Sequence, residues 1–256
     1  MGVLNVTPDS FSDGGEFIDL KKALKHTEMM IDNGADIIDI GGESSRPGAK
    51  VVSANEERKR IEPVIKSIKK IFNIPLSIDT YKPEIMNLSI DLGVEMINDI
   101  YALRQPGAIE VVINSDVILC LMHMKGKPKD MQNNPSYQNI IEEVNQFLKE
   151  RIDFCSQFGI DQKRLVVDPG FGFGKTYENN LKLFQSLNKL KFSTIPLLIG
   201  ISRKSMIRNI VGDEESDIIQ ASAIMSALAV LRGAKIVRVH DVKETNIALK
   251  ILQKNN

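Results

Sequence analysis

Hydrophobic residues gather in eight short runs along the chain, and each run ends at polar or ionisable residues. The runs are rich in Ile, Leu and Val and nearly continuous, which is typical of strands buried on both faces. Strand, polar tip and helix, repeated eight times, predict a (β/α)8 TIM barrel, an α/β fold. The predicted strands span residues 1–6, 36–40, 75–79, 95–99, 117–122, 164–168, 197–200 and 235–239.

The stretches between the runs carry apolar residues at helical spacing. In the first of them, Leu20, Ala23, Leu24, Met30 and Ile31 recur at this spacing. Helices are predicted over residues 20–33, 54–70, 108–114 and 140–158, with further helices ending near residues 90 and 252. No linker or low-complexity segment interrupts the pattern, so residues 1–256 are predicted to form one domain.

Composition limits the class of protein. The 256 residues match the ~250 typical of one such barrel. Lys+Arg and Asp+Glu are both 33, so no overall basic field would attract nucleic acid or anionic lipid. No apolar stretch approaches the ~20 residues that a membrane-spanning helix needs, and no signal peptide is visible. Cys120 and Cys155 are unclustered, which favours a reducing cytoplasm.

Three polar residues end predicted strands, where the active site of this fold lies. They are Asp79, Asn98 and Asp168. A carboxylate only accepts hydrogen bonds, whereas Asn both donates and accepts, so the set suits a flat heterocycle with N–H and amino groups on its edge. Each residue alone would more readily be read as a helix cap. Three on one rim favour a ligand.

A glycine-rich segment, residues 168–175, follows the sixth predicted strand. Its glycines would let the backbone approach a ligand, and Phe171 and Phe173 could wall an aromatic substrate. A merely flexible loop would leave both rings exposed without reason.

Cationic and hydroxyl side chains follow the last two predicted strands. Loops at these positions are the usual phosphate site of the fold. Asp241, with Glu244 three residues on, predicts a helix N-terminus, which would favour an anion near His240. Two earlier polar loops, residues 7–16 and 41–52, are long enough to move as lids, and Arg46 offers a two-pronged fork for phosphate.

Eight segments resemble dihydropteroate synthases of bacterial folate synthesis. They run the length of the chain and read MGVLNVTPDSFSDGG, IIDIGGESSRPGA, SIDTYKPE, INDI, CLMHMKG, DPGFGFGK, GISRKSMI and RVHDVKET. The resemblance implies a (β/α)8 barrel, usually a homodimer, that needs Mg2+ and is a target of sulfonamides. It also implies a transferase that joins 6-hydroxymethyl-7,8-dihydropterin diphosphate to p-aminobenzoate and releases pyrophosphate.

By position, the resemblance implies a role for each rim residue. Those that would hydrogen-bond the pterin edge are Asp79, Asn98, Asp168 and Lys204. Those that would line its slot are Met122, Phe173 and Gly200, with Arg238 along the ring face and reaching phosphate. Those around the diphosphate would be Ser45, Arg46 and His240, with Asn5 at the magnesium ion. The aminobenzoate pocket would be formed by Pro47, Phe173 and Ser205.

The chemistry of such a reaction points to a loose, dissociative substitution. The catalytic residues would be Arg46, Lys204, Arg238, His240 and Asp168. The cations would stabilise the departing diphosphate, and the incoming amine is already a nucleophile, so no general base is predicted.

Two departures and three alternatives accompany this hypothesis. Ser45 stands where the family commonly has Thr, and the short hairpin usual before the first strand is absent from this sequence. A pterin-binding methyltransferase domain, a catalytically silent pterin-binding paralogue and an unrelated barrel with a phosphate site are the alternatives. The helical stretch 220–231 is expected to pack on the barrel, with a dimer contact as the other reading.

Overall fold

Strands and helices alternate around a closed barrel. The computed structural model describes residues 1–7, 16–44, 48–190, 192 and 194–254, with only the backbone of residues 16–19. Six parallel strands pair in chain order: β1 (Gly2–Asn5), β2 (Ile38–Gly41), β3 (Leu76–Asp79), β4 (Met96–Asp99), β5 (Ile118–Met122) and β6 (Leu165–Asp168). A second parallel pair joins β7 (Leu198–Ile199) to β8 (Ile236–Val237).

Two isolated β-bridges close the barrel. Val167 pairs with Leu197, and Gly2 pairs with Val239, so β6 meets β7 and β8 meets β1. The backbone N–H of Val3 donates to Val239 O at 3.0 Å, which continues the ladder beyond β8. The predicted TIM barrel is therefore confirmed. The last two strands were predicted over 197–200 and 235–239, which is longer than the observed β7 and β8. Residues Leu197 and Val239 form only isolated bridges to β6 and β1, so they fall outside the regular ladder.

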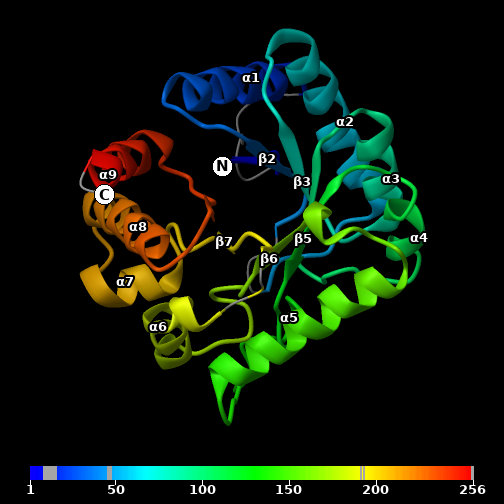
Figure 1. Ribbon diagram of the computed structural model, residues 1–256. Coiled ribbons are helices and arrows are strands. Elements are labelled where there is room, and N and C mark those ends of the chain that lie inside the picture. The colour runs from blue at the N-terminus through cyan, green and yellow to red at the C-terminus, as the bar shows by residue number, and fades with distance from the viewer. Residues whose placement is uncertain (8–15, 45–47, 191, 193, 255–256) are drawn as a thin grey trace.

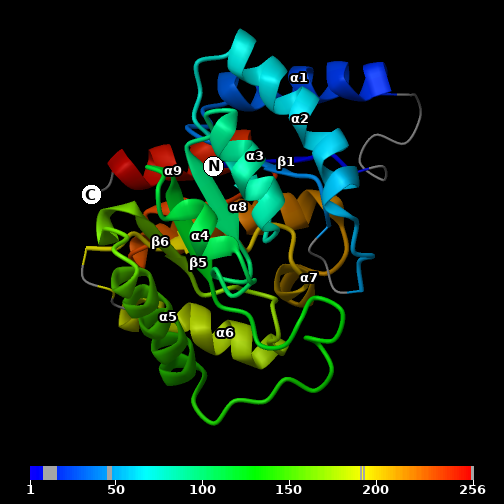
Figure 2. The ribbon, with the colours of Figure 1, turned by 90° about the vertical axis from the view of Figure 1, so that its right-hand side faces the viewer.

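The helices form the outer ring. Their bounds are α1 (Glu16–Asp32), α2 (Ala54–Ile71), α3 (Pro83–Asp91), α4 (Ala108–Val112), α5 (Ile140–Gln157), α6 (Tyr177–Gln185), α7 (Ser205–Val211), α8 (Glu215–Leu231) and α9 (Val242–Lys254). Figure 1 shows them following one another around the strands, with α1 at the top, α5 at the bottom and α9 at the left. In the turned view of Figure 2, the long connection between β5 and α5 extends to the lower right.

Strand alternation separates two sets of apolar side chains. Residues such as Ile40, Ile78 and Ile97 join the large cluster between strands and helices. The residues that alternate with them point into the barrel, and Met96, Cys120, Val166 and Leu198 form a second cluster there with Met1. Successive strand residues face opposite sides, so this register decides which polar side chains enter the barrel interior.

Two details differ from the predicted elements. α1 begins at Glu16, four positions before the predicted start at residue 20. The strand β7 is followed by two helices, because the short α7 precedes α8. Among the residues that the structure describes, no helix is long and apolar enough to cross a membrane.

Candidate active site

A salt-bridged cluster lies inside the barrel at the carboxyl ends of the strands. Arg238 Nε donates to Asp39 Oδ2 at 2.6 Å, and Arg238 Nη2 donates to Asp79 Oδ2 at 2.8 Å. Asn98 Nδ2 donates to the same Asp39 oxygen at 3.2 Å. The alternation of β2 and β3 explains this meeting, since Asp39 and Asp79 stand between residues that face the helices.

Burial and charge act against each other in this cluster. Burial raises the pKa of Asp79, while the guanidinium of Arg238 opposes the rise. Burial alone would lower the pKa of Arg238, but Asp39 and Asp79 raise it above its usual value. Asp39 is fully buried, and its Oδ1 has no hydrogen-bond partner among the described residues. The cluster therefore keeps a fixed cation between two carboxylates in a largely buried site.

Asp168 ends β6 on the other side of the interior. Its Oδ1 accepts a hydrogen bond from the Gly170 N–H at 2.7 Å, and the strand ladder pairs it with Met122. Burial raises the pKa of this carboxyl, and the positive charge of Lys204 lowers it in opposition. A buried carboxylate in this position can accept hydrogen bonds from a bound ring.

Lys204 extends over the turn that follows β6. Its Nζ donates to the Phe171 carbonyl and lies 4.7 Å from the centre of the Phe173 ring. Burial lowers its pKa to about 8, so its charge is sensitive to mildly alkaline conditions. Gly200 is close to this group of side chains, because a Cβ added there would lie 3.8 Å from Arg238 Cβ.

An apolar wall adjoins the polar groups. Met122 belongs to a cluster with Ile100, Met124 and Met131, and Phe173 packs against it. Tyr81 and Tyr101 complete this wall, with ring centres 4.7 Å apart. The sequence reasoning named Met122 and Phe173 but not the two tyrosines, which occupy turns after β3 and β4.

The loops after β7 and β8 meet at His240. Its backbone N–H donates to Ser202 Oγ at 3.2 Å, and its Nδ1 lies 3.1 Å from the same oxygen. Asp241 precedes α9, as the expected cap position requires, but its carboxylate forms a two-pronged ion pair with Arg203. Arg203 takes a left-handed backbone conformation, with φ of 58°, to reach it.

The remaining predicted site residues lie in different surroundings. Ser205 is exposed at the first position of α7. Asn5 ends β1, half-buried, and its Oδ1 would lie 3.6 Å from a Cβ added at Gly41. Ser45, Arg46 and Pro47 lie outside the described residues.

Two buried residues were missed by the sequence reasoning. Asp39 is one, and the inward register of β2 was the signal that could have identified it. Lys175 is the other, only 3% exposed behind the turn after β6. Nothing in the local pattern indicated its burial, because it stands in a polar segment.

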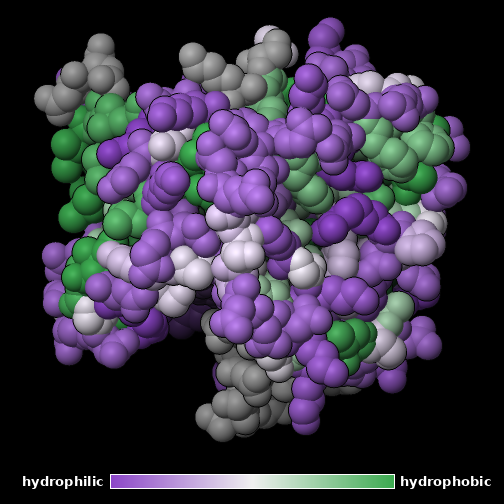
Figure 3. Space-filling view, turned by 90° about the horizontal axis from the view of Figure 1, so that it is seen from below, coloured by the Kyte–Doolittle hydropathy of each residue, from purple (hydrophilic) through white to green (hydrophobic). Residues whose placement is uncertain are grey.

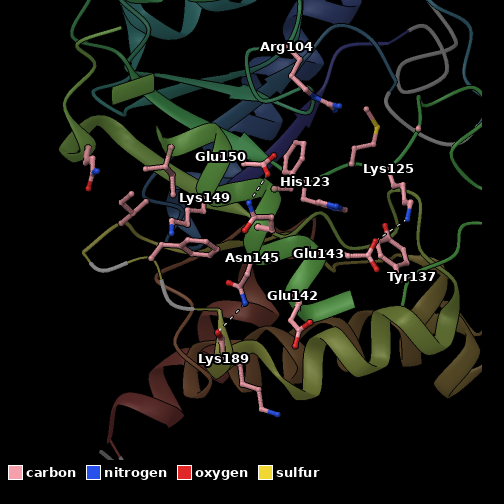
Figure 4. Close-up of a pocket in the computed structure, with 18 residues that line it drawn as sticks. Arg104, His123, Lys125, Tyr137, Glu142, Glu143, Asn145, Lys149, Glu150 and Lys189 are labelled. Carbon is pink, nitrogen blue, oxygen red and sulfur yellow. Dashed lines mark hydrogen bonds and ion pairs between the residues drawn. The ribbon is translucent and has the colours of Figure 1, made fainter. Parts of the chain in front are cut away.

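A hollow of about 1180 Å3 runs along α5 and reaches the site only at His123 and Met124. Figure 4 shows that charged side chains project around it, with Lys125 paired to Glu143 and Asn145 bonded to Lys189. Neither Asp79, Asn98 nor Asp168 lines it. The chemistry of the barrel interior therefore identifies the site better than the size of this surface depression.

The described residues include no group of three or more His, Cys, Asp and Glu side chains placed to hold a metal ion. Mg2+ often takes only one or two protein oxygens and completes its shell with substrate phosphate and water. The amide oxygen of Asn5 is a ligand of the required hard type, so the residues fit Mg2+ that arrives with a diphosphate.

Comparison with known proteins defines the class first. The model of the family described as pterin binding enzyme matches residues 1–240. The chain is 46% identical to the dihydropteroate synthase of Escherichia coli K12, over 99% of this chain and 90% of the relative. It is 48% identical to that of Neisseria meningitidis serogroup C, over 98% and 90%.

Solved structures agree with the sequence relatives. The Yersinia pestis dihydropteroate synthase with a sulfonamide drug complex superposes with a TM-score of 0.94 and 44% identity, over 100% of this chain and 93% of that one. The Burkholderia cenocepacia enzyme, complexed with 7,8-dihydropteroate, gives 0.90 and 41%, over 100% and 90%. The chain is a pterin-binding barrel enzyme, and within that class it belongs to the dihydropteroate synthases.

Proposed function

We propose that the protein condenses 6-hydroxymethyl-7,8-dihydropterin diphosphate with p-aminobenzoate, giving 7,8-dihydropteroate and pyrophosphate. The observation that carries the proposal is the polar edge inside the barrel, where Arg238 joins Asp39 and Asp79 beside an apolar wall. A related synthase from Xanthomonas albilineans was solved with 4-aminobenzoic acid, at 44% identity and a TM-score of 0.94, over 100% of this chain and 92% of that one.

The pterin would lie flat between the polar edge and the apolar wall. Asp79, Asn98 and Asp168 present acceptors and one amide donor to its N–H, amino and carbonyl groups. Lys204 would donate to a ring acceptor, and Arg238 would stack along the ring face while its carboxylate partners fix its plane. Met122 and Phe173 would exclude water from the ring.

The leaving diphosphate would meet the cationic loops at the rim. Arg238 and His240 would hold its oxygens, and Ser202 would fix the His240 ring in place. Arg46 and Ser45 would add contacts from the loop after β2. Mg2+, bound by the diphosphate and Asn5, would neutralise part of the departing negative charge.

The substitution is dissociative in this account. The buried carboxylate of Asp168 would stabilise positive charge that develops on the pterinylmethyl group as the C–O bond lengthens. The aromatic amine is a nucleophile without activation, so its positioning beside Phe173, Ser205 and Pro47 does the remaining work. No residue of this site acts as a general base in the account.

Positional isotope exchange tests this mechanism. The substrate carries 18O in the oxygen between carbon and phosphorus and is incubated with enzyme and Mg2+, without aminobenzoate. Reversible cleavage makes that oxygen equivalent to the other oxygens of the adjacent phosphate, so the label scrambles, as 31P NMR detects. We expect scrambling that stops when Mg2+ is chelated. Scrambling seen only with aminobenzoate present would contradict a dissociative step.

We also propose that the protein is a cytoplasmic homodimer. Beyond Gln220, α8 is apolar on its exposed side as well as its buried side: Ala223 and Ala229 are buried, while Ile224 and Leu231 are 57% and 55% exposed. A helix that is apolar on all sides is normally covered on all sides. Figure 3 shows apolar residues gathered at the left of the molecule, where α8 and α9 lie in Figure 1. The buried free thiols of Cys120 and Cys155 are consistent with a reducing compartment.

A further inference from the structure

The turn after β6 is held by side chains instead of by a backbone ladder. Each of the five consecutive carbonyls from Gly170 to Gly174 accepts a hydrogen bond from a side chain. The donors are Lys175 for Gly170 and Phe173, Lys204 for Phe171, Gln132 for Gly172 and Tyr137 for Gly174. Because glycine leaves the unfolded chain many alternative conformations, these donors help to select the one that the turn adopts.

Lys175 makes two of the five bonds and is the buried centre of the turn. Its Nζ lies 2.8 Å from Gly170 O, 3.1 Å from Phe173 O and 2.9 Å from His123 Nδ1. Burial, with the positive charge of Lys175, lowers the pKa of His123 to about 2, so the imidazole is neutral and can accept. All three polar neighbours of the buried amine are therefore uncharged.

Burying an amine among uncharged acceptors costs free energy that an apolar side chain would not. An apolar side chain, however, would remove the side-chain donor of Gly170 O and the Lys175 donor of Phe173 O. These two carbonyls are the ends of one tight turn, since the Phe173 N–H also donates to Gly170 O at 3.1 Å. Lys175 thus fixes the turn that carries the Phe173 ring.

The positions of the Phe173 ring and the Asp168 carboxylate depend on this turn to different degrees. Asp168 is the last residue of β6, and its ladder with β5 holds it independently. Phe173 has no strand partner, and its half-buried ring lies under the Lys204 ammonium and against Met122. Loss of the two Lys175 bonds would therefore release Phe173 more than Asp168.

We propose that Lys175 is a positioning residue that holds the Phe173 ring where the aminobenzoate slot requires it. The inference rests on the proposed function, in which Phe173 walls that slot and Asp168 holds the pterin. It predicts that loss of Lys175 weakens binding of aminobenzoate much more than binding of the pterin diphosphate. A general contribution of Lys175 to folding would affect both substrates alike.

The test compares the two Michaelis constants in the full-length protein. Lys175→Met keeps most of the side-chain length and removes the donor. We expect the KM for p-aminobenzoate to rise about tenfold or more, the loss of roughly one good contact, while the KM for the pterin diphosphate changes less than about threefold. An unchanged aminobenzoate KM, or an equal rise of both constants with a lowered Tm, would overturn the proposal.

Three further variants make the result specific. Tyr137→Phe removes one bond from the same turn, but at Gly174, beyond the ring, and should leave both constants within about twofold. Phe173→Ala sets the reference: if it does not raise the aminobenzoate KM, the proposed role of Phe173 fails, whatever Lys175 does. Lys175→Gln retains an amide donor on a shorter side chain and replaces Lys175→Met if that variant does not fold. It should give a smaller rise that is still confined to the aminobenzoate KM, and an equal rise of both constants would contradict the proposal.

Discussion

At the scale of single residues, Arg238 links the stability of the barrel interior to its chemistry. One guanidinium bridges Asp39 from β2 and Asp79 from β3 at 2.6 and 2.8 Å. Removing one partner of a buried ion pair strands the other charge, which costs more than the pair contributes. The residue that we place along the pterin face therefore also holds two inward carboxylates in fixed positions.

Arg238→Gln should lower the free energy of unfolding by about 3 kcal/mol, because it leaves Asp39 and Asp79 without their cation. Urea unfolding measures this loss. Adding Asp39→Asn should restore a large part of the stability without restoring turnover, since the diphosphate contact stays missing. A single variant as stable as the original protein would show that the carboxylates need no guanidinium.

Lys204 should set the alkaline limit of activity. Burial lowers its pKa to about 8, so the free enzyme carries the ammonium below that pH and loses it above. Because the proposed role is donation to the pterin, kcat/KM for the pterin diphosphate should fall above about pH 8. Lys204→Arg should move this limit beyond the measurable range. If kcat/KM of the original protein stays constant up to about pH 9.5, the charge of Lys204 is not required for activity.

At the scale of elements, the turn after β6 explains why its glycines are required. They were expected to let a ligand approach, and the structure adds a steric reason within the chain itself. A Cβ on Gly170, at φ of 67°, would lie 1.9 Å from His123 O, and one on Gly174 would lie 2.2 Å from Lys125 O. The backbone of this turn is therefore packed directly on the loop after β5.

Gly170→Ala should be far more harmful than Gly159→Ala, although both positions are left-handed. Gly159 follows α5 with φ of 81° and nothing within 4 Å, so alanine should cost about 1–2 kcal/mol there. Gly170→Ala adds a backbone clash and should also weaken aminobenzoate binding. Thermal unfolding and the aminobenzoate KM measure both effects. Equal losses of stability would contradict the packing described.

The sequence predicts elements well where its periodicity is strong. Strand alternation around Asp39, Asp79 and Asn98 needs only the pattern of apolar neighbours, and it brings these side chains into one interior. The pattern does not predict the burial of Lys175, because that depends on His123 from the loop after β5 and on the carbonyls of a turn without regular structure. Nor does it separate α7 from α8, since short helices leave little periodicity.

At the scale of the whole molecule, the exposed apolar face of α8 should determine the oligomeric state. Ile224→Glu combined with Leu231→Glu should convert the proposed dimer to a species of one chain, 28.6 kDa, by light scattering. Ile71→Glu is the matched control, because Ile71 is similarly exposed, at 58%, but ends α2 on another side. A control variant that dissociates equally, or an original protein that is already monomeric, would refute the interface.

The most direct test of the account is turnover by the purified protein. It is incubated with the dihydropterin diphosphate, p-aminobenzoate and Mg2+, while pyrophosphate release and dihydropteroate mass are followed. We predict equal amounts of both products, formation that ends on chelation, and no formation by Lys204→Ala. Pterin binding without product would indicate a catalytically silent relative, and a protein that binds no pterin would contradict the assignment of the barrel site.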